Sequence, residues 1–151
     1  MTELPDAELL ATLVSNVTET MCGISFCPEG SPVDEGAHSW RVASLPISGE
    51  RPLRVILSSD QKGCEGLGAA LLHFPAHELE PDMIDDSLCE LLNMAAGQIK
   101  RALSIDQALG LPRIVPGVQG QALFQAAKRQ GILLRSRGPL DLLIWVTEEP
   151  S

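Results

Sequence analysis

The segment from Pro81 to Ser104 carries the strongest helix signal in the chain. Pro81 suits a first helical turn, acidic residues follow it, and Lys100 and Arg101 lie near the end, as the helix macrodipole favours. Apolar residues recur at helical spacing along one side: Ile84, Leu88, Leu91, Leu92, Ala95, Ile99, Ala102 and Leu103. A helix with one apolar side must bury that side, so the pattern predicts a long helix packed on a second layer.

The patterns on either side of this helix predict what that second layer is. Residues 5–22 have helical spacing with Gly23 as a stop, and residues 40–47 and 52–58 resemble two strands of a hairpin. Ser58 or Ser59 is the expected cap of a helix that runs to about Leu72. A short strand is predicted within 109–117, and residues 121–130 are compatible with either helix or strand. Two final strands flank a turn at 137–139.

We therefore expect one domain over residues 1–151 with an α/β fold of the two-layer α+β kind. Its sheet is antiparallel or mixed, and the long helix lies across one face. A chain of 151 residues is long enough to bury a core of that kind.

The charge balance excludes several kinds of partner. The net charge is −9, which would repel the phosphates of nucleic acids and anionic membrane surfaces. With three Phe, two Trp and no Tyr, the chain also has few rings on which bases could stack. No apolar run approaches the roughly 18 residues of a membrane span, and the start lacks the pattern of a signal peptide. The expected location is the cytoplasm.

The polar side of the long helix has an unusual composition. Asp86, Glu90, Asn93, Gly97 and Lys100 fall within an arc of roughly 100° on a helical wheel. Asn is a poor helix former, and a glycine costs about 1 kcal/mol relative to alanine inside a helix. Ala96 and Gly97 are small, so we expect a bare patch beside Asn93 where another protein's surface approaches the helix backbone closely.

The residues of this segment resemble a known signature. D86-SLC-E90-LL-N93 is similar to the active helix of the CheC/CheX family of chemotaxis phosphatases, in which Asp or Ser, three residues, Glu, two residues and Asn follow one another. The run L111-PRIVP-G117 resembles the strand entry that follows this helix in CheX. The first predicted helix has apolar residues, Leu10 and Leu13, at the positions that correspond to Glu90 and Asn93 of the motif. The chain therefore resembles a CheX-like member of the family, with a single site.

The resemblance implies a CheX-like fold and a protein phosphatase of chemotaxis or two-component signalling. Its substrate is the aspartyl phosphate of a CheY-like response regulator, here called the receiver. Asn93 is expected to orient the attacking water, and Glu90 to pair with the receiver's active-site lysine. Asp86, Ala96, Gly97 and Lys100 are expected to contact the partner. Magnesium belongs to the receiver, so this chain is expected to hold no metal or cofactor, and a homodimer formed through the sheets is implied.

Several other interpretations remain open from sequence alone. Family membership is compatible with a non-catalytic receiver-binding or dimerisation module, and helical periodicity alone would make Glu90 and Asn93 a solvated face. His73 and His77 have the i, i+4 spacing of zinc ligands, but Pro75 interrupts them. Cys64 is a candidate nucleophile without a histidine tied to it by sequence.

Two weaker patterns predict no site. The glycines between Gly63 and Gly68 match no nucleotide-binding motif. A basic group near the end of the chain is expected to form a solvated edge: Lys128, Arg129, Arg135 and Arg137.

Overall fold

The computed structural model describes residues 4–29, 40–115, 119–120, 122–123, 125, 132–138 and 140–148. Its described strands form one seven-stranded sheet in the order β1-β6-β7-β3-β2-β4, with β5 also paired to β2. Every one of these pairings is antiparallel. The elements are α1 (Ala7–Cys22), β1 (Phe26–Pro28), β2 (Arg41–Ser48), β3 (Leu53–Ser59), α2 (Gln61–Leu72), the 3₁₀ turn η1 (Ala76–Glu78), α3 (Pro81–Ala102), β4 (Ala108–Leu109), β5 (Arg113–Ile114), β6 (Ile132–Ser136) and β7 (Asp141–Glu148).

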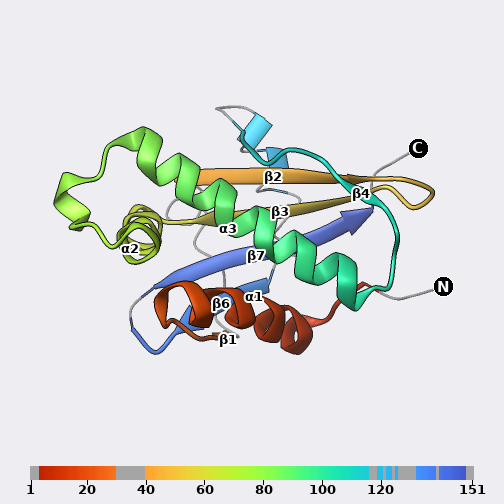
Figure 1. The fold of residues 1–151 in the computed structure, drawn as a ribbon, viewed down its shortest axis with the longest axis horizontal. Helices are drawn as coiled ribbons and strands as arrows, with labels where there is room; N and C mark the ends of the chain where they lie inside the picture. Colours follow the sequence, from red (N-terminus) through yellow and green to blue (C-terminus); the bar gives the residue numbers. More distant parts are fainter. Residues whose placement is uncertain are drawn as a thin grey trace.

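Helices α1, α2 and α3 lie together on one face of the sheet, with α3 crossing it diagonally (Figure 1). Alternate residues of each strand point toward the helices, as the two-residue period of a strand requires. In β2 these are Ala43, Leu45 and Ile47, all 0% exposed, and they belong to the same core cluster as Leu88 and Leu92 of α3. The predicted two-layer fold with the long helix across the sheet is therefore confirmed.

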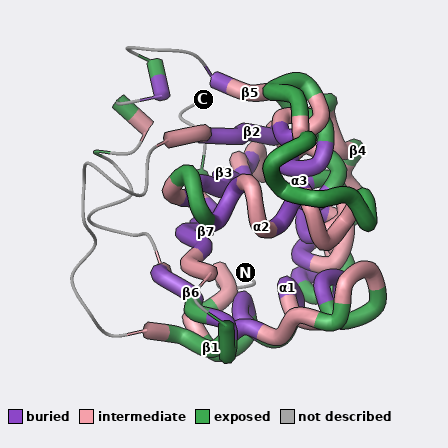
Figure 2. Tube along the Cα trace, turned by 90° about the vertical axis from the view of Figure 1, so that its left-hand side faces the viewer, coloured by how far each residue is buried: buried purple, intermediate pink, exposed green. Residues whose placement is uncertain are grey.

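The opposite face of the sheet is also apolar at its centre. A second, smaller cluster there contains Val42, Ile56, Leu133, Leu143 and Trp145, and Leu123 packs against it. The central strands β3 and β7 are accordingly buried along most of their length (Figure 2). Because both of their faces are covered, these strands read in sequence as nearly continuous apolar runs rather than as strict alternation.

The helix ends follow from the capping residues. The Asp6 carboxylate accepts a hydrogen bond from the Leu9 N–H at 2.9 Å and starts α1, and Gly23 ends it with a φ of 71°, as the sequence predicted. For α2 the predicted cap, Ser58 or Ser59, is wrong. Asp60 is the cap, accepting from the Gly63 N–H at 2.7 Å, because both serines are still buried in strand β3.

The outer edge of strand β1 is closed by a side chain of α1. The Ser15 hydroxyl accepts a hydrogen bond from the Phe26 N–H at 2.9 Å and donates one to the Phe26 carbonyl at 3.2 Å. Because both backbone groups of Phe26 bond to Ser15, they must point away from β6, the strand that pairs with β1 on its other side. Pro28, two residues further on, has no backbone N–H.

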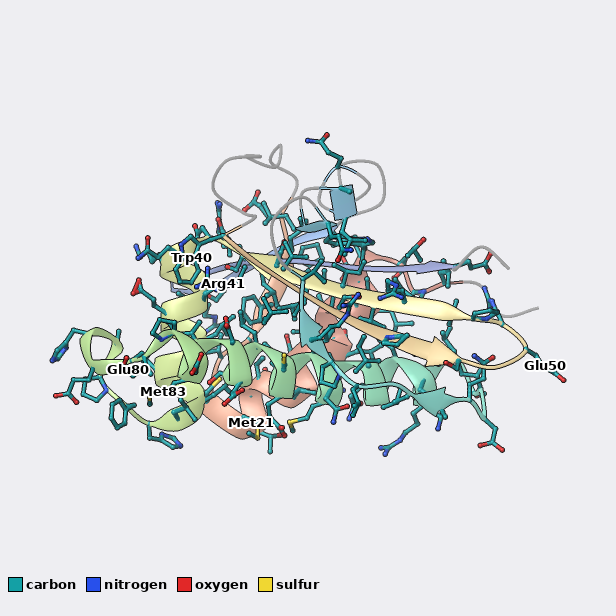
Figure 3. The ribbon with its side chains drawn as sticks, turned by 90° about the horizontal axis from the view of Figure 1, so that it is seen from above. Met21, Trp40, Arg41, Glu50, Glu80 and Met83 are labelled. Atoms are coloured by element: carbon teal, nitrogen blue, oxygen red, sulfur yellow. The ribbon has the colours of Figure 1, made fainter. Side chains whose placement is uncertain are left out.

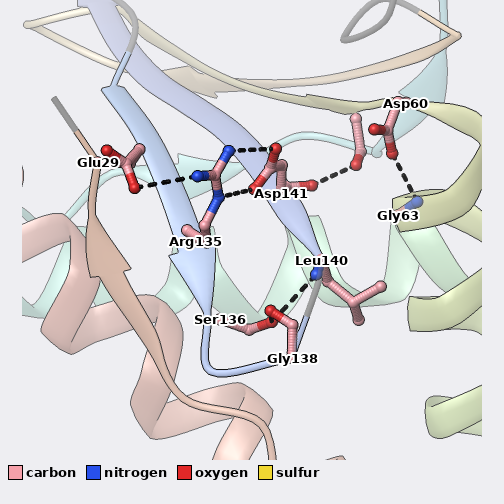
Figure 4. Close-up of polar contacts among 9 residues, drawn as sticks. Glu29, Asp60, Gly63, Arg135, Ser136, Gly138, Leu140 and Asp141 are labelled. Carbon is pink, nitrogen blue, oxygen red and sulfur yellow. Dashed lines mark hydrogen bonds and ion pairs between the residues drawn. The ribbon is translucent and has the colours of Figure 1, made fainter. Parts of the chain in front are cut away.

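An arginine ties the same three strands together on the surface. Arg135 of β6 makes a bidentate pair with Asp141 of β7, and a further ion pair to Glu29 beyond β1 at 3.2 Å (Figure 4). The hydrogen bonds that Arg135 donates to the Asp141 carboxylate raise the pKa of the guanidinium. The turn between β6 and β7 is held by Ser136, whose hydroxyl bonds to Gly138 and Leu140.

Candidate functional site

The site predicted from sequence lies on helix α3, whose first turn is built by local residues. Pro81 occupies the first turn, and the Glu80 N–H donates to the Met83 sulfur at 3.4 Å (Figure 3). The apolar side is then buried completely: Leu88, Leu91, Leu92, Ala95 and Ile99 are each 0% exposed. Burial of this side fixes the rotation of the helix, so its polar side must face outward.

Glu90 and Asn93 are exposed on the outer face, one turn apart, as predicted. Within the described part of the chain, neither side chain makes a hydrogen bond or an ion pair. Asp86 is exposed one turn before Glu90. The Glu90 carboxylate and the Asn93 amide thus lie side by side without hydrogen-bond partners among the described residues. Both are therefore available to hydrogen-bond a group of another molecule.

Gly97 continues this face one turn beyond Asn93. A side-chain carbon placed on Gly97 would meet nothing within 4 Å, so the glycine is not required by packing inside this chain. The residue is half-buried, as is Lys100. The bare stretch of helix predicted beside Asn93 is therefore present at Gly97.

The expectation that Ala96 contributes to this bare stretch is wrong. Ala96 is 0% exposed and belongs to the main core, so it is no part of a contact surface. Helix α3 contacts β2, β4 and β5 as well as the centre of the sheet, and Ala96 packs in the core that these elements share. Ala102, which was predicted on the buried side, is exposed where the helix ends.

The outer face of α3 is exposed at Asp86, Glu90 and Asn93. Hollows lie elsewhere, for example one of about 490 Å³ lined by Gln61, Lys62, Glu65, Gly66, Ala76 and Leu140 on α2 and its neighbours. Small-molecule sites enclose most of their ligand. A pair of polar groups on the exposed side of a helix is instead suited to a group presented by another macromolecule.

A pair of residues that sequence reasoning missed flanks the first half of α3. Arg41, at the start of β2, donates from Nε to Asp85 Oδ1 at 3.0 Å, and its guanidinium carbon lies 4.1 Å from the centre of the Trp40 ring. Trp40 and Arg41 are adjacent in Figure 3. Arg41 and Asp85 are 44 residues apart, so no local spacing in the sequence could have paired them.

The cysteines near the helices are protonated thiols. Burial, with a further contribution from Asp60, raises the pKa of Cys64 to about 12. Burial and the neighbouring Asp85 and Asp86 raise the pKa of Cys89 as well. A thiol that holds its proton at neutral pH is a poor nucleophile, so the interpretation of Cys64 as a nucleophile is wrong.

The remaining candidate groups are dispersed. His73 ends α2, whereas His77 lies in the separate turn η1. Among the residues that the structure describes, no three His, Cys, Asp or Glu residues are placed to hold a metal ion. Of the basic group, Arg135 is paired with carboxylates of β7 and the segment after β1, and Lys128 and Arg129 lie outside the described residues.

The fold and the site together define a class: an antiparallel sheet crossed by a helix that presents an exposed Glu–Asn pair without a partner among the described residues. Comparison with known families gives this class a name, since the profile described as "Chemotaxis phosphatase CheX" matches residues 41–133. The chain belongs to the CheX family of chemotaxis phosphatases. This confirms the family resemblance carried by the motif on α3.

Solved structures of this family share the fold over nearly the whole chain. A CheX from Desulfovibrio desulfuricans matches with a TM-score of 0.63 and 18% identity, covering 93% of this chain and 96% of its own. A CheC-like protein from Shewanella sp. PV-4 gives 0.68 and 18%, covering 93% and 95%. The CheX–CheY–BeF3–Mg complex from Borrelia burgdorferi gives 0.69 and 13%, covering 93% and 96%. No curated protein matches the sequence.

The helices of the described residues do not meet the requirements of a bilayer span. None of them combines the length and the apolar character that crossing a membrane needs.

Proposed function

We propose that this chain hydrolyses the aspartyl phosphate of a CheY-like receiver, using Glu90 and Asn93 of α3. The single observation that carries the proposal is the exposed Glu–Asn pair, which has no partner among the described residues of a CheX-family chain. The solved complex of a CheX with CheY, BeF3 and Mg supports a CheY-like partner.

Asn93 is the proposed water-positioning residue. Phosphoryl transfer needs a water molecule in line with the scissile P–O bond more than it needs covalent help from a side chain. The Asn93 amide oxygen accepts a hydrogen bond from that water and turns its lone pair toward phosphorus. An amide does not titrate, so this role requires no adjustment of a pKa.

Glu90 is the proposed registering residue. Its carboxylate, one turn from Asn93, pairs with the lysine of the receiver's active site and so fixes where the helix sits on the partner. Asp86, Gly97 and Lys100 lie around the pair and form the contact surface, with Gly97 allowing close approach. In this proposal the receiver binds the magnesium, both proteins act in the cytoplasm, and the chain forms a homodimer.

The test measures the decay of a phosphorylated receiver with and without the protein, beside Asn93→Ala. We expect the acceleration to fall about 100-fold in the variant, because a misplaced nucleophile costs that much, while receiver binding survives. Asn16→Ala is the matched control, since Asn16 is an exposed asparagine on α1. Unaltered decay of every receiver of the organism in the presence of the wild type would reject catalysis. Retained binding would then leave the chain as a receiver-binding module.

A further inference from the structure

Arg41 is held in a fixed position against the first half of α3, the helix that carries the proposed site. Three contacts restrain its guanidinium: Nε donates to Asp85 at 3.0 Å, Nη1 donates to the Trp40 carbonyl at 3.2 Å, and the group stacks on the Trp40 ring at 4.1 Å. Stacking on an aromatic face and pairing with a carboxylate both restrict an arginine to one rotamer. Little side-chain entropy therefore remains to be lost when Arg41 binds something further.

The restrained guanidinium still has donors to offer. An arginine carries five N–H donors, and among the residues that the structure describes only Nε and one N–H of Nη1 find an acceptor. The side chains of Arg41 and Asp85 are 28% and 30% exposed, so the pair is reachable from outside. A planar, preorganised fork with free N–H groups is suited to a carboxylate or phosphate of a partner.

The Arg41–Asp85 pair lies on the flank of α3 that meets strand β2, two turns before Asn93. Asp85, Cys89 and Asn93 follow one another at i, i+4 and i+8, a ridge that turns by about 40° at each step, so Asp85 is rotated about 80° from Asn93 around the helix. Eight residues at a rise of 1.5 Å place Asp85 about 12 Å from Asn93 along the helix axis. A protein interface of ordinary size covers about 800 Å² on each partner, a round patch of about 16 Å radius. A receiver that covers Glu90 and Asn93 therefore meets the Arg41–Asp85 pair at the border of its contact area.

Charge indicates what Arg41 would meet. Asp82, Asp86 and Glu90 make the first half of the exposed α3 face acidic. A receiver that binds magnesium beside its aspartyl phosphate must also carry carboxylates there. Like charges facing each other across an interface are costly, and a fixed cation at the border of the acidic face offsets that cost.

We propose that Arg41, backed by Trp40 and Asp85, is a receiver-docking residue that donates to a carboxylate on the border of the receiver's phosphorylation site. The proposal rests on the proposed function, because it takes a receiver as the partner of this same face. Arg41 contributes affinity for the receiver, whereas Asn93 acts in the hydrolytic step.

The experiment compares Arg41→Gln with Arg51→Gln. Arg51 is also an arginine paired with a carboxylate, Glu148 at 2.9 Å, but it lies at the hairpin between β2 and β3. The dephosphorylation rate is measured against the concentration of phosphorylated receiver, at low and high salt. We expect Arg41→Gln to raise KM about fivefold, to leave kcat within twofold, and to weaken the salt dependence of KM. Arg51→Gln should change none of these.

Two further measurements separate docking from folding and from catalysis. Arg41→Lys retains the charge without the planar fork, so its KM should lie between those of the wild type and Arg41→Gln. The Kd for a receiver loaded with beryllofluoride and Mg²⁺, measured by calorimetry, should rise by the same factor as KM. Thermal unfolding of each variant shows whether the fold is intact.

The outcomes distinguish this proposal from the proposed function. If hydrolysis is present and Arg41→Gln leaves both KM and Kd unchanged, or lowers only kcat, Arg41 is no docking residue and the phosphatase proposal stands. If hydrolysis is absent but the loaded receiver binds, a raised Kd in Arg41→Gln supports docking while catalysis fails. A wild type that neither hydrolyses nor binds any receiver overturns both.

Discussion

Substitutions at Gly97 should raise the stability of the protein, and a long side chain there should weaken its action on the receiver. Nothing lies within 4 Å of a carbon added at Gly97, so no clash offsets the gain of replacing glycine inside a helix. That gain is about 1 kcal/mol for Gly97→Ala, chiefly because the unfolded chain loses conformational freedom. For a chain of this size it corresponds to a rise of about 2–4 °C in Tm.

The functional part of the prediction uses a longer side chain at the same position. Gly97→Gln should keep roughly half or more of the stability gain, since glutamine is a good helix former. Its side chain would nevertheless project about 6 Å along the helix from Asn93, into the surface proposed for the receiver. We expect KM for the phosphorylated receiver to rise about tenfold in Gly97→Gln and much less in Gly97→Ala.

Chemical denaturation and receiver kinetics on the same preparations check both parts. Asn16→Ala on α1 is the control, because it should also stabilise an exposed helix position, by about 0.5 kcal/mol, without touching the site. The reasoning about open space is refuted if Gly97→Ala lowers the free energy of unfolding. The reasoning about docking is refuted if Gly97→Gln is stable and turns over the receiver with an unchanged KM.

Three further predictions concern the core and the thiols. Gly63→Ala should destabilise the protein by about 1–3 kcal/mol in urea, because its added carbon would lie 2.8 Å from the backbone oxygen of Asp141. Leu92→Ala should cost about 2–5 kcal/mol in the same assay, since Leu92 is 0% exposed on the buried side of α3. With a pKa raised to about 12, Cys64 should stay unlabelled by a thiol reagent at pH 8 until the chain unfolds, whereas exposed Cys27 should react in the native state. Rapid native labelling of Cys64 would contradict its burial.

The sequence predicted α3 and its exposed pair well because one periodic signal governs both. Burial of residues such as Leu88 and Leu92 fixes the rotation of the helix, and Glu90 and Asn93 must then face outward. Ala96 shows where this reasoning ends. Ala96 lies at the margin of the polar arc. Its burial results from the packing of α3 against the sheet, which a helical wheel does not represent.

Contacts between distant segments were beyond prediction for a different reason. The pairing of Arg41 with Asp85 depends on how α3 crosses the sheet, and no spacing in the sequence encodes that crossing. The cap of α2 was missed by one residue, because Ser59 is a favourable cap type that the sheet instead retains as the end of β3. Cap propensity located the start of α2 to within one residue. Because the sheet retains Ser59, the next residue, Asp60, is the cap.

The serine at the outer edge of β1 has a consequence for behaviour at high concentration. A sheet edge with free N–H and C=O groups can be extended by a strand of another molecule, which is a route to fibrils. Ser15 occupies the outward backbone groups of Phe26, and Pro28 has no N–H to give. This edge therefore offers an added strand fewer free backbone groups, and a single hydroxyl of α1 removes two of them.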